Sequence, residues 1–121
     1  MFVQTYPVEV TTDGSGDATV FSPELNGLLD RIQYVKDDFA DGVDFTITLE
    51  STGETLWAEN DVNAAAVRAP RQPVHSPAGA ALLYADAGEP VSDLIAVNGR
   101  AKIVIANGGA AKSGTFRFVT V

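Results

Sequence analysis

Cysteine is absent from this 121-residue chain, histidine occurs once, and lysine and arginine together number only eight. The lack of cysteine excludes disulfides, thiolate metal sites and cysteine nucleophiles. With sixteen acidic residues the formal net charge is −8, which repels phosphate backbones, so we expect no nucleic-acid partner. No apolar run approaches the roughly 18 residues of a membrane-spanning helix, and we expect no membrane contact. The stretch from Met1 to Pro7 lacks the basic and apolar segments of a secretory signal, which predicts folding in the cytosol.

Strand patterns fill most of the chain. From Val43 to Glu50, apolar residues alternate with polar ones, so a strand would bury one face. The turn formers of residues 51–54 precede a second apolar segment, Thr55 to Ala58, and together these residues predict a hairpin. The C-terminal segments, Arg100 to Ala106 and Thr115 to Val121, suggest another hairpin.

Further strand candidates are spaced almost regularly along the chain, at Phe2 to Thr12, Ala18 to Phe21, Leu28 to Lys36, Leu82 to Tyr84 and Leu94 to Val97. About eight strands joined by turn-forming residues predict an all-β, jelly-roll-like β-sandwich formed by a single domain over residues 1–121. At most a short helix is expected, in the alanine-rich window from Asp61 to Val67.

A proline-rich segment interrupts this pattern, and we expect an extended arm or loop at about residues 59–81. Within it, prolines stiffen the backbone and two arginines stand out in an otherwise acidic chain, which suits docking onto an acidic protein surface. The alternative is a solvated crossover loop. The residues predicted to bind a partner are Arg68, Pro70, Arg71, Pro73 and His75.

Motifs for catalysis, metals or phosphate are incomplete. The carboxylates of residues 37–44 and 13–17 lack the full ligand spacing of a calcium loop and are interpreted as turns. The loop of residues 108–113 has alanine where a phosphate-binding loop needs glycine before its lysine, and a strand follows it. His75 has no nucleophile motif near it. We therefore predict no enzyme activity, no metal and no cofactor, and keep a carboxylate-based hydrolase as a minor alternative.

Aromatic side chains lie at strand positions. We predict that Tyr34, Trp57, Phe116 and Phe118 form core, with packing against a partner as the alternative. Trp57 also leaves open a carbohydrate-binding role.

Three stretches resemble small virion proteins of tailed bacteriophages, in particular capsid decoration or cement proteins: residues 27–36, Val43 to Trp57, and residues 99–121. The resemblance implies a jelly-roll-like, non-enzymatic protein that assembles as a dimer or trimer on the capsid exterior. There it would bind the major capsid protein and stabilise neighbouring capsid subunits, after synthesis in the host cytoplasm. The alternative is a tail, head–tail connector or receptor- or carbohydrate-binding component.

Overall fold

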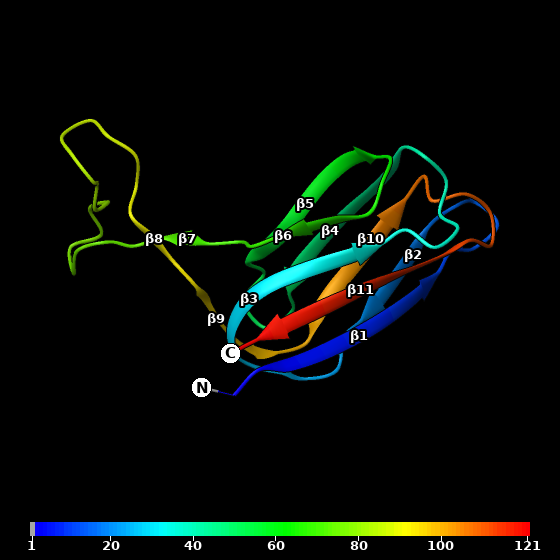
Figure 1. The fold of residues 1–121 in the computed structure, drawn as a ribbon, viewed down its shortest axis with the longest axis horizontal. Coiled ribbons are helices and arrows are strands. Elements are labelled where there is room, and N and C mark those ends of the chain that lie inside the picture. The colour runs from blue at the N-terminus through cyan, green and yellow to red at the C-terminus, as the bar shows by residue number, and fades with distance from the viewer. Residues whose placement is uncertain (1) are drawn as a thin grey trace.

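Two antiparallel sheets pack face to face in the computed structural model, which describes residues 2–121 (Figure 1). The first sheet has the order β1-β11-β3-β6, and β9 also pairs with β3; the second has the order β2-β10-β4-β5. The strands of the first sheet are β1 (Gln4–Thr11), β3 (Leu25–Val35), β6 (Ala66–Arg68), β9 (Ile95–Gly99) and β11 (Ser113–Thr120). Those of the second are β2 (Ala18–Phe21), β4 (Val43–Leu49), β5 (Thr55–Val62) and β10 (Ala101–Ala106). A separate small ladder joins β7 (Gln72–Pro73) to β8 (Ser92–Asp93). The predicted all-β sandwich is confirmed.

At most a short helix is expected, with Asp61 to Val67 as its window, and residues 2–121 contain none. The end of β5 keeps Val62 buried and paired with Val43, whereas Ala66 already pairs with Tyr34 in the other sheet. The alanines therefore carry the chain from one sheet to the other, because the pairing at both ends outweighs their helix preference. No helix in this part of the chain is long and apolar enough to cross a membrane.

The core lies between the sheets, and β4 shows how the sequence builds it. Val43, Phe45, Ile47 and Leu49 are buried, and the residues between them face outward, as the alternation predicts. The predicted β4–β5 hairpin is also present, with Ile47 opposite Trp57.

Aromatic rings join the two sheets at the centre of the core. The ring of Phe45 lies 4.7 Å from that of Trp57 and 5.1 Å from that of Phe116, and Tyr34 stacks 5.2 Å from Phe116. Phe118 is fully buried as well. The prediction that these aromatic residues form core is confirmed.

The C-terminal strands do not form the hairpin that their sequence suggests. β10 pairs with β2 and β4 in the second sheet, and β11 pairs with β1 and β3 in the first. Each of the two strands buries one apolar face against the opposite sheet. The loop between them therefore passes from one sheet to the other at the edge of the core. Local alternation does not distinguish such an arch from a hairpin.

The pairing of the strands is nested. If β7, β8 and β9 are set aside, the first of the remaining eight strands pairs with the last, the second with the seventh, the third with the sixth, and the fourth with the fifth. The eight strands thus form one long antiparallel hairpin, and this hairpin is rolled up into the two sheets. Residues 69–100, which contain β7, β8 and β9, are inserted between the sixth and seventh strands of this hairpin.

Candidate interaction arm

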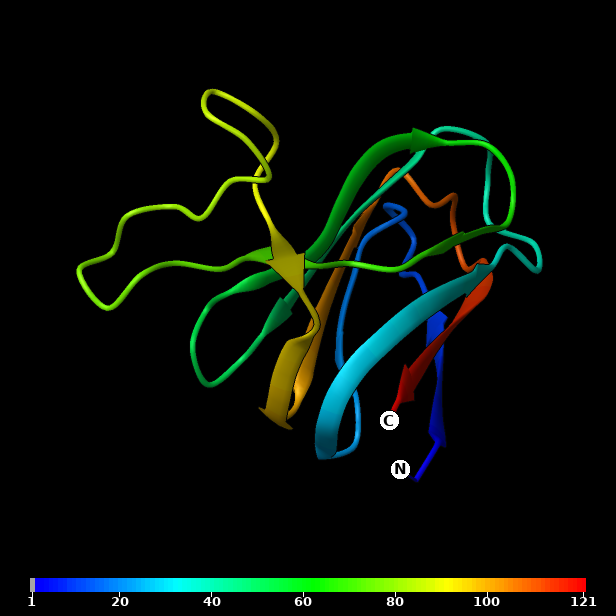
Figure 2. The same ribbon diagram turned by 60° about the vertical axis from the view of Figure 1, so that its left-hand side comes forward.

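Residues 72–93 leave the sandwich and project from one side of it, as both views show (Figures 1 and 2). We call this segment the arm. It is held at its base by the two-residue ladder in which Gln72 pairs with Asp93 and Pro73 with Ser92. The predicted range of 59–81 overlaps the first part of the arm, whereas residues 59–68 lie largely in β5 and β6.

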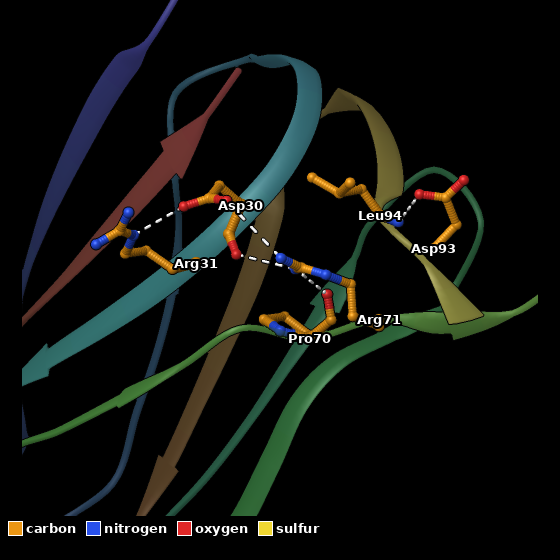
Figure 3. Close-up of polar contacts among 6 residues, drawn as sticks. All are labelled: Asp30, Arg31, Pro70, Arg71, Asp93 and Leu94. Atoms are coloured by element: carbon orange, nitrogen blue, oxygen red, sulfur yellow. Dashed lines mark hydrogen bonds and ion pairs between the residues drawn. The ribbon is translucent and has the colours of Figure 1, made fainter. Parts of the chain in front are cut away.

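Arg71 fastens the base of the arm to β3 (Figure 3). Its Nη1 donates to the backbone carbonyl of Asp30 at 3.0 Å and to that of Pro70 at 2.9 Å, and its Nη2 lies 3.7 Å from Oδ1 of Asp30. The Asp30 carboxylate also accepts a hydrogen bond from Arg31 Nε at 2.8 Å.

The carbonyl of Asp30 is available because β3 is irregular at this point. The pairing with β11 passes from Arg31–Val119 to Leu29–Thr120, so Asp30 is an extra residue in its strand. On its other edge, β3 pairs with β9 up to Leu29 and with β6 from Ile32 onward. Arg71 therefore occupies the interval between two pairing strands and satisfies a backbone acceptor there.

Arg68 closes the same side of the sandwich at the end of β6. Its guanidinium donates to both carboxylate oxygens of Glu59 on β5, at 2.9 and 3.1 Å, and lies 5.6 Å from the ring centre of Trp57. The indole N–H of Trp57 donates to the same carboxylate at 2.9 Å. These hydrogen bonds, that of Arg68 first, lower the pKa of Glu59.

Both arginines predicted to bind a partner therefore have partners within the chain. Pro70 lies beside Arg71 and accepts its hydrogen bond, and Pro73 lies in β7. His75 is exposed and forms an isolated bridge with Ala81. Partner binding by these five residues stays a prediction; within the chain, Arg71 bonds to β3 at the base of the arm and Arg68 bonds to β5.

Beyond its base, the arm is organised by its own backbone. Val74 N–H donates to the carbonyl of Val91 at 2.9 Å, Val91 to that of Leu82 at 2.9 Å, and Leu82 to that of Val74 at 3.1 Å. Two loops diverge from this centre, residues 75–81 and 83–90 (Figure 2). Within the described chain, the backbone hydrogen bonds of residues 74–91 join residues of the arm to one another.

Nothing in the arm is buried. No residue between Val62 and Ile95 is buried, and every residue from 77 to 90 is exposed. Three consecutive apolar residues lie in this stretch: Leu82 is 45% exposed, Leu83 42% and Tyr84 75%. Large apolar residues in a row on a projecting segment are typical of a binding surface, because water contact with them is unfavourable.

The prediction of a short strand from Leu82 to Tyr84 is wrong: these residues are exposed in the arm, and only Leu83 forms an isolated bridge, to Pro90. The available signal was a brief apolar run between two loops rich in proline, glycine and alanine, with no alternating neighbour strand.

The acidic loops are used structurally. Asp38 accepts from the backbone N–H of Ser113 at 2.6 Å, and Asp37 from the Thr115 hydroxyl at 2.8 Å. Phe39, between them and Gly42, is buried and stacks 6.2 Å from Tyr34. The carboxylate of Asp13 accepts from the N–H groups of Ser15 and Asp17, and these hydrogen bonds lower its pKa.

Three backbone N–H groups of the loop at residues 108–113 donate to the β1–β2 turn. Gly108 N–H donates to the carbonyl of Gly16, Ala111 to that of Asp13, and Lys112 to the Thr12 hydroxyl. These contacts support its interpretation as a structural connection.

Residues 2–121 contain no detected pocket and no group of three side chains placed to hold a metal ion. A scan against models of known protein families and a search of curated proteins both found no match to this chain.

Proposed function

We propose that the protein is a non-enzymatic capsid decoration protein of a tailed bacteriophage, which binds the outer capsid surface and stabilises neighbouring capsid subunits. The observation that carries the proposal is the arm: an ordered, exposed segment with an apolar centre on a rigid β-sandwich. Burial of apolar area contributes about 25 cal/mol per Å², so an arm seated on another protein adds stability to the assembly. Repetition over many copies multiplies that effect.

The nested strand pairing supports a finer description of the fold, a jelly roll. A ribbon in which the first strand pairs with the last and the fourth with the fifth is what rolling one long hairpin into two sheets produces. Jelly rolls recur in viral capsid and lectin domains, which agrees with a virion protein.

The main alternative is a tail, head–tail connector or receptor-binding component of the same virion. Its arm would serve equally well there, and the location in the particle distinguishes the two. For carbohydrate binding, Trp57 is a poor platform, because it is buried and its indole N–H is bonded to Glu59. A sugar would need an exposed ring face.

The test uses capsid shells of the encoding phage assembled without this protein. Purified full-length protein is added, and bound copies per shell are measured by sedimentation, followed by the melting temperature of the shells. We expect saturable binding at a fixed ratio to the major capsid protein and a higher melting temperature. Absence of binding, or location on the tail in intact particles, would contradict the proposal.

A further inference from the structure

The arm and its base differ in charge. Between Gln72 and Asp93 the chain contains three acidic residues, Asp86, Glu89 and Asp93, and no lysine or arginine. The cationic groups near the arm, Arg68 and Arg71, lie at its base, where carboxylates and backbone carbonyls already surround them. The arm beyond its base therefore carries only acidic charge, whereas the two arginines predicted to bind a partner lie before it.

Acidic and apolar side chains come together in one loop of the arm. Leu83 pairs with Pro90 across this loop, and the N–H of Tyr84 donates to the carbonyl of Glu89 at 3.1 Å. The turn that joins them contains Asp86 and closes with a hydrogen bond from Gly88 N–H to Ala85 at 2.8 Å. We call residues 82–90 the tip. Within the tip, Tyr84 therefore lies opposite Glu89 and close in sequence to Asp86.

The tip is already shaped before it meets a partner. Three backbone hydrogen bonds among Val74, Leu82 and Val91 hold its two ends together, and Pro90 restricts the returning strand. A preorganised segment loses less conformational entropy on binding than a disordered one, so exposed apolar groups on it convert efficiently into affinity.

We propose that the tip is the docking element of the arm, and that it seats in an apolar depression of the major capsid protein rimmed by lysine or arginine. This inference rests on the proposed function and names the chemistry of the partner surface. Apolar anchors need an apolar seat, and carboxylates beside them are favoured by a basic rim and repelled by an acidic one. A second copy of this chain fits less well, because each copy carries a net charge of −8.

The test compares full-length variants on the same protein-free shells. The tip variant is Leu83→Ser with Tyr84→Ser. Its control is Phe21→Ser with Val104→Ser, which removes two apolar side chains, 39% and 37% exposed, from the outer face of β2 and β10 in the sandwich. A third variant, Asp86→Asn with Glu89→Gln, removes the charge of the loop. Melting temperatures are measured first, and we expect the exposed tip substitutions to leave the fold intact.

We expect the tip variant to bind shells at least about tenfold more weakly than wild type, and the control to bind like wild type. The neutralised variant should bind several-fold more weakly at low salt, with a shallower dependence on salt concentration.

Equal binding by the tip variant and wild type would overturn the inference while leaving the proposed function standing. Tighter binding by the neutralised variant would overturn the basic rim. Failure of wild type to bind would overturn both the function and the inference. Sedimentation of free protein completes the set, since self-association lost only in the tip variant would assign the tip to a second copy and overturn the capsid seat.

Discussion

At the scale of single residues, the contact between Arg68 and Glu59 connects the two sheets beside the arm. Because hydrogen bonds from Arg68 and Trp57 lower the pKa of Glu59 in the folded protein, the charged carboxylate stabilises the fold. That contribution is complete above the ordinary pKa of 4.5 and is lost as the pH falls through the lowered folded value.

We therefore expect the advantage of wild type over Glu59→Gln in unfolding free energy to shrink as the pH falls from about 6 to about 3. Urea unfolding at a series of pH values measures it. In an Arg68→Ala background the same comparison should depend less on pH. A difference that stays constant with pH would show that the pair does not act through charge.

Tyr34 carries a polar atom that the core does not satisfy. Its hydroxyl is buried without a hydrogen-bond partner among the described residues, and burial, followed by the charges of Asp37 and Asp41, raises its pKa to about 12. Removing an unsatisfied buried hydroxyl ends a desolvation cost, so Tyr34→Phe should leave the unfolding free energy unchanged or raise it by about 1 kcal/mol. Thermal unfolding measures the effect. A loss of stability would reveal a hydrogen bond to an ordered water.

Gly27 is required by a close backbone approach. Its φ is +112°, and an added Cβ would lie 2.7 Å from the carbonyl oxygen of Val121. That carbonyl accepts from Leu28 N–H at 3.0 Å, so the C-terminus cannot move away without losing the bond.

Gly27→Ala should cost about 2 kcal/mol or more, because both strain and displacement of the last strand follow from it. Gly53→Ala is the matched control, since its φ is +74° but an added Cβ meets nothing within 4 Å. We expect that control to cost about 1 kcal/mol. Equal losses in thermal unfolding would contradict the role of the close approach.

At the scale of elements, the arm differs from the strands in how it is held. The strands bury one face against the opposite sheet, whereas residues 63–94 bury none of their side chains completely. Local opening costs little where few apolar contacts must be broken.

Limited digestion with chymotrypsin should therefore cut first after Leu82, Leu83 or Tyr84, and the cut chain should keep the sandwich folded. Mass spectrometry identifies the sites, and circular dichroism follows the fold. Phe116 and Phe118, fully buried in β11, serve as internal controls that should resist cleavage. Initial cleavage in β11 would contradict the assignment of the arm as the least protected element.

Elements with strong local signals were predictable, and their arrangement was not. The period-two pattern of Val43 to Leu49 determines which face is buried, and the turn before Thr55 determines the hairpin. The partners of β10 and β11 depend on contacts between residues far apart in the chain, which no local pattern contains. For the arm, the prolines predicted an extended segment. The roles of Arg71 and Arg68 could not be predicted, because Asp30 and Glu59 reach them only through the fold.

At the scale of the whole molecule, the sandwich and the arm differ in burial, and under the proposed function they have different roles. The sandwich contains the entire buried core and provides a rigid base, and the arm presents apolar and acidic groups to the outside. The net charge of −8 makes two free copies repel each other, and under the proposed function this repulsion favours attachment to a different surface.

Hydrogen–deuterium exchange of the full-length protein, free and bound to protein-free shells, tests this division most directly. We predict that amides of residues 82–90 exchange more slowly on shells than in the free protein, whereas those of β4 and β10 exchange alike in both states. Arm amides that exchange at the same rate in both states, with protection appearing on the sandwich, would contradict the account.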